Sequence, residues 1–159
     1  MPESVRDRCT KAHEYVFMLS KSARYWFDGG AIAEGTVSER DRGRPNGAQT
    51  FEKFGRNTSC GTSSDGTRNR RSVWTIATQP FSEAHFAVMA PELAETCIKA
   101  GCPEGGIVLD PFGGAGTTGL VADRLRRDAI LIELNPDYAE IARNRISNDA
   151  GIFAEVAAE

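Results

Sequence analysis

The sequence predicts an α/β fold with a mostly parallel sheet, because short apolar runs alternate with helical segments along its second half. Strands that are apolar on both faces and alternate with helices are typical of parallel sheets covered by helices. The first of these helical segments also has Pro91 in its first turn and Gly101 directly after its end, as real helices often do. The elements expected are strands at 107–110 and 129–134 and helices at 91–100, 117–127 and 136–146.

The composition is that of one ordinary globular domain. The chain has 159 residues, 40% of them apolar and 26% charged, which is enough to form a real core. The net charge of −3 gives no case for nucleic-acid binding by the chain as a whole. No signal peptide or membrane-spanning run is present in the sequence. We therefore expect a cytoplasmic protein with no membrane partner.

The cysteines and histidines do not form a metal pattern. Four cysteines are present, none in a CxxC pair, and His13 and His85 complete no zinc spacing. Free thiols in a reducing compartment and no metal site are the expectation.

The first half of the chain is less regular. Residues 13–19 are apolar enough for a buried strand, 25–27 form a second short candidate, and 72–77 predict a further strand. Between them, 29–71 is rich in Gly, Arg, Ser, Thr and Asn. From Glu34 onward this segment has eight Lys or Arg against five acids, and we expect a long mobile basic loop.

The most informative stretch is IVLDPFGGAGTTG, Ile107–Gly119. Its last six residues form a GxGxxG that follows a strand and opens a helix, as a dinucleotide fingerprint does. Asp110, directly before the turn, would face a pyrophosphate unfavourably and suits an amino group better. Phe112 adds an aromatic ring at the mouth of the turn. A P-loop is excluded because its lysine is missing.

A second acid follows on the next strand. Glu133 ends that strand 23 residues after Asp110, where an acid can accept hydrogen bonds from both ribose hydroxyls of an adenosine. Each acid alone has a simpler explanation, Asp110 as a cap of the following turn and Glu133 as a solvated loop acid. Together they favour a ligand with an amino group, a ribose and no phosphate, which is S-adenosyl-L-methionine.

Three segments of the chain resemble a known family. LDPFGGAGTTGLVA followed by ILIELNPDYAEIARNRI is similar to the cofactor motif and its successor in DNA amino-methyltransferases, which methylate adenine N6 or cytosine N4. HFAVMAPELAETCI resembles the segment that precedes the glycine turn in the permuted class of these enzymes. RCTKAHEYVFMLSKSARYWFD resembles a strand pair that follows the catalytic motif in that class. The resemblance implies a Rossmann-like methyltransferase fold, incomplete in this chain.

The resemblance also implies roles for single residues. Asp110 and Phe112 would face the methionine and sulfonium, Gly114 and Gly116 would permit close backbone approach, and Glu133 would hold the ribose. The hydroxyls of the two threonines that open the helix would donate to the cofactor. His85 and Phe86 have core packing as the alternative, and Thr118 has a simple helix-start role. The complete expected cofactor set is His85, Phe86, Ala87, Asp110, Phe112, Gly113, Gly114, Gly116, Thr117, Thr118, Glu133 and Leu134.

No catalytic residue is assigned, because the family's [DNS]PP[YFW] segment does not occur in the sequence. Asn135–Pro136–Asp137–Tyr138 has one proline only, and we expect Asn135 to cap a helix that Pro136 begins. Tyr138 would face the core or the adenine edge. The chain therefore resembles a C-terminal portion, and an exposed sheet edge would favour self-association or an N-terminal partner chain.

The expected organisation has four parts: a strand pair at 1–28, a flexible basic insertion at 29–71, a cofactor-binding portion at 72–147 and a tail at 148–159. The insertion would contact double-stranded DNA through phosphate-binding arginines, with a solvated loop as the alternative. Those arginines are Arg40, Arg42, Arg44, Arg68, Arg70 and Arg71. Rival functions are an RNA or small-molecule methyltransferase, and a non-catalytic remnant or subunit of a split enzyme.

Overall fold

A strand–helix–strand unit forms the centre of the computed structural model, which describes residues 7, 9, 13–35, 66–77 and 88–150. Strand β3 (Ile107–Asp110) leads through helix α2 (Thr117–Arg124) into strand β4 (Asp128–Leu131). The two strands are parallel and in register from Ile107 opposite Asp128 to Asp110 opposite Leu131. The predicted α/β class with parallel strands is confirmed for this unit.

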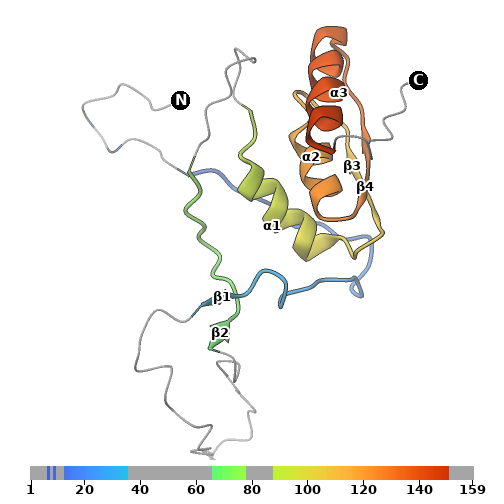
Figure 1. Ribbon diagram of the computed structural model, residues 1–159. Helices are drawn as coiled ribbons and strands as arrows, with labels where there is room; N and C mark the ends of the chain where they lie inside the picture. Colours follow the sequence, from blue (N-terminus) through green and yellow to red (C-terminus); the bar gives the residue numbers. More distant parts are fainter. Residues whose placement is uncertain (1–6, 8, 10–12, 36–65, 78–87, 151–159) are drawn as a thin grey trace, which may run out of the picture.

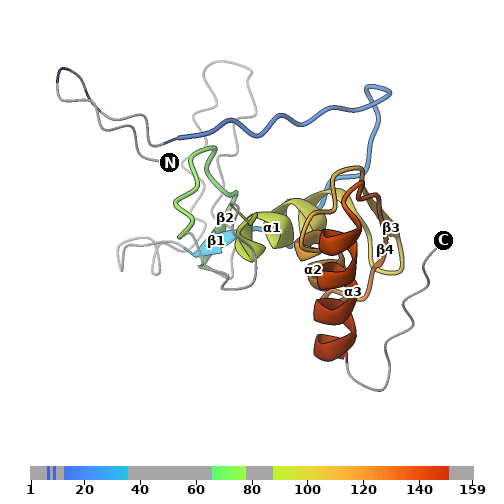
Figure 2. The same ribbon diagram turned by 90° about the horizontal axis from the view of Figure 1, so that it is seen from above.

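Two further helices pack against α2, as Figures 1 and 2 show. Helix α1 (Pro91–Gly101) precedes the unit and α3 (Pro136–Ala150) follows it, and both contact α2. The core lies where α1 meets α2, and small side chains there let the two helices approach closely. Its buried cluster is Ala94, Ile98, Val121 and Ala122, with Cys102, Val108 and Leu125 packed against it.

The observed boundaries differ from the predicted ones at the end of α2. The helix ends at Arg124, three residues before the predicted end, because Arg126 adopts the left-handed conformation with φ 59°. A residue in that conformation stops a helix. Strand β4 consequently begins at Asp128 and ends at Leu131, whereas α3 continues to Ala150.

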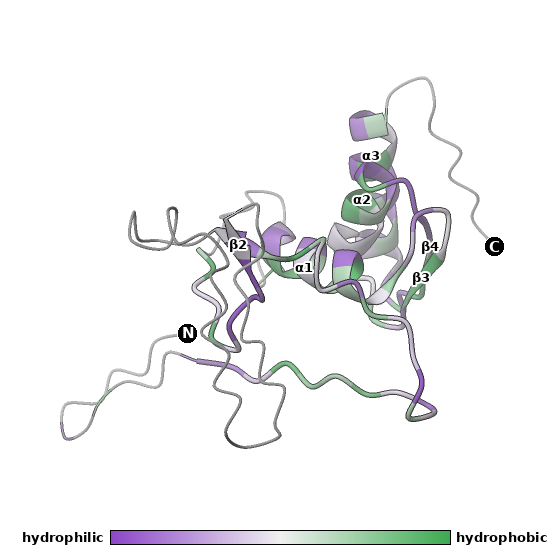
Figure 3. Cartoon of the chain, turned by 90° about the horizontal axis from the view of Figure 1, so that it is seen from below, coloured by the Kyte–Doolittle hydropathy of each residue, from purple (hydrophilic) through white to green (hydrophobic). Residues whose placement is uncertain are grey.

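One face of the β3–β4 pair carries no helix among the described residues. Ile107, Leu109, Ile130 and Ile132 lie on this face and are 53–63% exposed. Figure 3 shows strand β3 in the colour of hydrophobic residues. An exposed apolar face of this kind is typical of a surface that another element covers.

Three predicted strands are not found. Residues 13–19, 25–27 and 72–77 have no strand assignment, and Tyr15 to Leu19 are 57–91% exposed, so the prediction of a buried strand was wrong for this structure. An extended segment becomes a strand only when a neighbour pairs with its backbone groups. No neighbour among the described residues does so for these segments.

The ends of the basic insertion are joined by a short ladder. Strand β1 (Glu34–Gly35) pairs antiparallel with β2 (Thr67–Arg68). The flanks of the predicted loop therefore have defined structure, and residues 36–65 lie outside the described part of the chain.

No helix in the described part of the chain is long and apolar enough to span a membrane.

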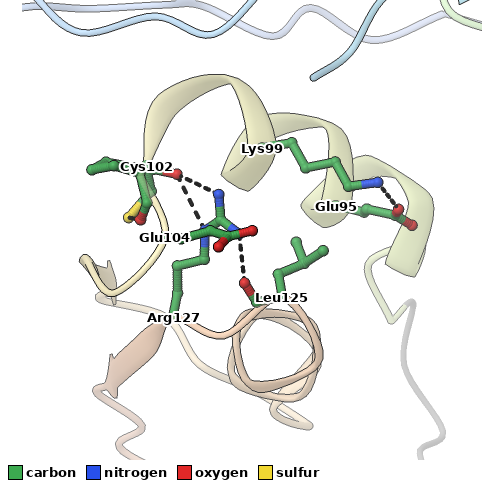
Figure 4. A network of polar contacts seen from close by, with 7 residues as sticks. Glu95, Lys99, Cys102, Glu104, Leu125 and Arg127 are labelled. Carbon is green, nitrogen blue, oxygen red and sulfur yellow. Dashed lines mark hydrogen bonds and ion pairs between the residues drawn. The ribbon is translucent and has the colours of Figure 1, made fainter. Parts of the chain in front are cut away.

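The side chain of Arg127 joins the connections that follow α1 and α2, as Figure 4 shows. Its Nε and Nη2 donate to the carbonyl oxygen of Cys102 at 3.2 and 2.9 Å, and its Nη1 donates to the carbonyl oxygen of Leu125 at 2.5 Å. The side chain is only 8% exposed, and Glu104 lies 4.0 Å from Nη1. One buried guanidinium thus satisfies carbonyl groups at the ends of two helices.

We predict that Arg127→Met destabilises the fold by about 1–3 kcal/mol, because it leaves partly buried carbonyl oxygens without donors. Urea unfolding followed by circular dichroism measures this as a lower midpoint at an unchanged slope. Arg143→Met on the exposed side of α3 is the control, since it removes the same charge from the surface. Equal midpoints for the two variants would contradict this role of Arg127.

Candidate functional site

The glycine turn lies across the carboxyl ends of β3 and β4. The amide of Gly113 donates to the carbonyl of Ile132 at 2.9 Å, and that of Gly116 donates to the carbonyl of Gly113 at 2.8 Å. Gly114 and Gly116 have φ values of +51° and +76°, a region that favours glycine. The carboxyl ends of parallel strands are where α/β proteins bind ligands.

Asp110 holds the two sides of this turn together. Its Oδ1 accepts from the amide of Phe112 at 2.9 Å, and its Oδ2 accepts from the hydroxyl of Thr118 at 2.6 Å. The carboxylate thus caps the turn and connects the end of β3 to the first residues of α2. The simpler explanation of Asp110 as a turn cap is present in the geometry, and it does not exclude a ligand contact.

Glu133 supports the same turn from the neighbouring strand. Its Oε2 accepts from the amide of Gly114 at 2.8 Å, and its Oε1 accepts from the amide of Asn135 at 2.8 Å. Backbone hydrogen bonds from Asn135 and Gly114 hold the pKa of Glu133 below its ordinary value, because they stabilise the ionised form. Glu133 is therefore an ionised carboxylate at neutral pH.

The glycines are required for different reasons. A Cβ at Gly116 would lie 2.8 Å from the Cβ of Ala142, and one at Gly113 would lie 3.0 Å from the Cβ of Leu131. A Cβ at Gly114 would meet nothing closer than 3.9 Å. We predicted close ligand approach for both Gly114 and Gly116. The space beside the Cα of Gly114 is open, so a ligand can approach the backbone there. The space beside the Cα of Gly116 is filled by Ala142 of α3.

The hydroxyl of Thr118 donates its proton within the protein and not to a cofactor, whereas the hydroxyl of Thr117 accepts a hydrogen bond and keeps its own proton, so donation by Thr117 stays a prediction. Thr117 and Thr118 are 3% and 8% exposed. Thr118 donates to Asp110, and Thr117 accepts from Nη1 of Arg145 at 3.0 Å.

Arg145 is a site residue that sequence reasoning missed. The same Nη1 donates to the carbonyl of Ala115 at 3.0 Å, so this guanidinium ties α3 to the glycine turn. Arg145 lies one helical turn after Ala142, which packs on Gly116. No pattern in the sequence identifies this role, because it arises only when α3 packs on the turn.

The start of α3 is as predicted. Asn135 Oδ1 accepts from the amide of Asp137 at 3.0 Å, and Pro136 is the first helical residue. Asn135 therefore acts as the cap. Tyr138 is half-buried.

A cavity of about 350 Å³ adjoins Asp110 between α1 and β3. Asp110 and Thr118 supply its polar end, and the remaining lining is apolar or sulfur-containing. The lining residues are Met89, Ala94, Cys97, Ile98, Gly101, Cys102, Ile107, Val108, Leu109, Asp110 and Thr118. Burial raises the pKa of the Cys97 thiol. Cys9, Cys97 and Cys102 are free thiols.

The other predicted cofactor residues are exposed or undescribed. Phe112 is 87% exposed and Leu134 is 99% exposed, beside the two carboxylates at the strand ends. His85, Phe86 and Ala87 lie outside the described residues. Among the described residues, no group of three or more His, Cys, Asp or Glu could hold a metal ion.

Three of the predicted phosphate-binding arginines lie beside the β1–β2 ladder. Arg68 and Arg71 contact Glu34, and Arg70 lies near Glu92. Arg68 and Arg71 therefore share one carboxylate, whereas Arg70 contacts α1, and Figure 1 shows β2, which contains Arg68, apart from β3 and β4. Arg40, Arg42 and Arg44 lie outside the described part of the chain.

The lowered pKa of Glu133 predicts a pH-dependent contribution to stability. The contribution is fully present above the ordinary pKa of 4.5 and is lost as pH falls through the lower value of the folded state. We expect Glu133→Gln to lower the unfolding midpoint at neutral pH, and the difference from the unsubstituted chain to shrink in acid. Urea unfolding over a pH series measures both, with Glu140→Gln on the exposed side of α3 as control. A difference that stays constant down to acidic pH would contradict the assignment.

Comparisons with known proteins agree with the resemblance seen in the sequence. The family model for N6/N4 DNA methylases matches residues 1–144. The type II methyltransferase M.Cfr9I of Citrobacter freundii is 41% identical over 158 residues, which cover 99% of this chain and 44% of that protein. M.SmaI of Serratia marcescens is 42% identical over 145 residues, 91% of this chain and 41% of that protein. The chain therefore spans less than half the length of these relatives.

Solved structures overlap with a smaller part of the chain. The cytosine-N4-specific PvuII DNA methyltransferase is 32% identical and covers 42% of this chain and 27% of its own, with a TM-score of 0.37. A DNA modification methylase of Thermus thermophilus, TTHA0409, complexed with S-adenosyl-L-methionine, is 38% identical and covers 41% and 27%, with a TM-score of 0.36. The family assignment depends on the sequence matches. Since the family model matches nearly the whole sequence, this chain belongs to the N6/N4 DNA methylase family.

Proposed function

We propose that this chain is the cofactor-binding part of a DNA amino-methyltransferase and binds S-adenosyl-L-methionine at the carboxyl ends of β3 and β4. The observation that carries the proposal is the pair of carboxylates, Asp110 and Glu133, on both sides of one glycine turn. Bound there, the cofactor supplies a methyl group carried on a sulfonium. The residues of this chain supply its binding and orientation.

The charges at the turn favour this ligand over a nucleotide. Asp110 and Glu133 are close enough that the charge of Asp110 acts to raise the pKa of Glu133. Two neighbouring carboxylates would repel a phosphate and attract the ammonium and sulfonium of S-adenosyl-L-methionine. The usual phosphate preference of a glycine turn before a helix is therefore reversed here.

Both carboxylates can bind a ligand without releasing the turn. Each oxygen of Asp110 and Glu133 accepts one hydrogen bond from the protein, and a carboxylate oxygen has a second lone pair. Asp110 would accept from the ammonium of the methionine part, and Glu133 would accept from the ribose hydroxyls. The protein contacts hold both groups in position before the ligand arrives, which lowers the entropy cost of binding.

The apolar surroundings suit the remaining parts of the cofactor. Phe112 and Leu134 project from the strand ends and would cover the sulfonium and the adenine. Gly114 leaves space for close approach of the ligand to the backbone. The cavity of about 350 Å³ beside Asp110 is in the size range of small-ligand sites and would receive the methionine part.

The acceptor of the methyl group would be an exocyclic amine of adenine or cytosine in DNA. Such an enzyme must extrude the base into a pocket and draw the lone pair of the amine toward the methyl group. The [DNS]PP[YFW] segment that does this in the family is absent from the sequence. We infer that this chain binds the cofactor but does not transfer the methyl group by itself.

The uncovered side of the sheet supports the same inference. Among the described residues, no helix covers the apolar face that Ile107, Leu109, Ile130 and Ile132 form on the β3–β4 pair, and β3 pairs only with β4, so its other edge is unpaired. The relatives are more than twice as long as the matched chain. We propose that a polypeptide equivalent to the remainder of those relatives covers this face and supplies the amine-polarising segment.

We predict that the 159-residue chain binds S-adenosyl-L-methionine and that Asp110→Asn weakens binding at least tenfold. An ionic hydrogen bond of about 1.5–3 kcal/mol is lost, although asparagine keeps the shape of the turn. Isothermal titration calorimetry on a sample shown to be folded by circular dichroism measures this. Asp123→Asn on the exposed side of α2 is the matched control. Absence of binding, or equal affinity for the two variants, would disprove the site.

We also predict that the pure chain incorporates no labelled methyl group into double-stranded DNA, with a full-length type II methyltransferase as the positive control. Activity should appear only when a polypeptide carrying [DNS]PP[YFW] is added, and size-exclusion chromatography should then show a heterologous complex. Turnover by the chain alone would refute the inference. A stable homodimer that ignores the added polypeptide would refute the proposed covering of the sheet.

A further inference from the structure

Helix α3 contacts the glycine turn at Gly116, whereas the backbone at Gly114 is open. Arg145 of α3 donates hydrogen bonds to the same turn. We propose that Arg145 is a positioning residue for S-adenosyl-L-methionine, which raises the affinity for the cofactor by holding the turn in its binding conformation. This inference rests on the proposed cofactor site and adds a residue that acts through the turn instead of touching the ligand.

One face of α3 runs along α2, as Figures 1 and 2 show. Its contact residues are three or four positions apart in the sequence, so they lie on one side of the helix. Each meets a residue further along the chain than the one before, and the helix therefore supports the turn and α2 together. The contacts are Ala142 beside Gly116, Arg145 on Thr117, Ile146 beside Gly119 and Asp149 on Arg124.

The glycines of the turn do not fix its conformation by themselves. Gly114 and Gly116, on either side of Ala115, have φ values of +51° and +76°. Glycine adopts positive and negative φ with nearly equal ease, so the peptides next to Ala115 can rotate at a low cost in free energy. Other groups must therefore hold these peptides in one orientation.

The peptide that joins Ala115 to Gly116 is held at both ends. Its N–H, the amide of Gly116, donates to the carbonyl of Gly113 at 2.8 Å. Its carbonyl, that of Ala115, accepts from Nη1 of Arg145 at 3.0 Å. A rotation of this peptide would break both hydrogen bonds. Arg145 therefore opposes the rotation that the two glycines permit.

The same nitrogen of Arg145 also fixes the start of α2. Nη1 donates to the hydroxyl of Thr117 at 3.0 Å, and Thr117 is almost completely buried. The next residue, Thr118, donates to Oδ2 of Asp110 at 2.6 Å. Arg145 thus acts one residue away from the hydroxyl that orients Asp110, the carboxylate proposed to meet the ammonium of the cofactor.

The positive charge of Arg145 lies near a carboxylate on its own helix. The hydrogen bond and charge of Arg124, together with the charge of Arg145, hold the pKa of Asp149 below its ordinary value against the effect of burial. Nε and Nη2 of Arg124 donate to the two oxygens of Asp149 at 2.7 and 2.5 Å. Both arginines therefore join α2 to α3, but Arg145 does so at the turn and Arg124 at the last residue of α2. Arg124 is the matched control.

A turn that is held less firmly binds the cofactor more weakly, although no contact with the ligand is lost. The apparent affinity falls in proportion to the fraction of molecules in the binding conformation. If that fraction is about one in ten, the affinity is about ten times lower. Arg145 would thus control the affinity from behind the binding surface.

Isothermal titration calorimetry with S-adenosyl-L-methionine on Arg145→Met and Arg124→Met tests the proposal, at a temperature where circular dichroism shows both variants to be folded. We expect Arg145→Met to bind at least about fivefold more weakly than the unsubstituted chain, and Arg124→Met to bind equally well. Hydrogen exchange of the Gly116 amide, followed by NMR without ligand, should be faster in Arg145→Met than in Arg124→Met. A general loss of stability would affect both variants alike.

Equal affinity of the two variants, or equal exchange rates at Gly116, would overturn the role of Arg145 while leaving the cofactor site in place. Absence of binding by the unsubstituted chain would disprove the cofactor site, and this proposal with it. If Arg145→Met does not fold, Arg145→Lys and Arg124→Lys replace the pair. Lysine keeps the charge near Asp149, but its nitrogen ends one bond short of Nη1, so the same differences in affinity and exchange are expected.

Discussion

The hydrogen bonds from Asp110 and Glu133 to one glycine turn are the interactions on which the candidate site depends. Asp110 ties the turn to the start of α2, and Glu133 ties it to the start of α3. Two helices and two strands are thereby joined at the carboxyl edge of the sheet. Because each carboxylate oxygen keeps a lone pair, the groups that build the turn are also those that would meet the ligand. Structure and proposed binding thus use the same two charges.

The two faces of the β3–β4 pair are covered to different extents. The helices cover one side of β3 and β4, and the apolar side chains of the other side are more than half exposed. Burial of apolar surface stabilises a protein by about 25 cal/mol per Å², and the surface of these side chains that stays in water does not make this contribution. A partner that covers this face would therefore gain binding energy by burying these side chains. The arginines at the β1–β2 ladder form a second, separate charged region, at the base of the insertion.

The sequence predicted the elements whose signals are local and missed those that depend on distant contacts. The strand before Asp110 and the cap at Asn135 follow from apolar runs and cap chemistry within a few residues. Residues 13–19 have an equally good strand pattern but no pairing neighbour in the described structure. Asp110 and Glu133 were found by their place at strand ends. Arg145 was missed because its role arises only when α3 packs on the turn.

The central claim is that the turn between Asp110 and Glu133 is a preformed site for S-adenosyl-L-methionine. Two-dimensional ¹H–¹⁵N NMR spectra recorded during a titration with the cofactor test it most directly, because each amide reports its own position. We expect the largest shifts at the amides of Gly114, Phe112 and Asn135, while the amides of α3 beyond its first turn change little. Shifts confined to other regions of the chain, with the amides of the turn unchanged at saturation, would contradict the claim.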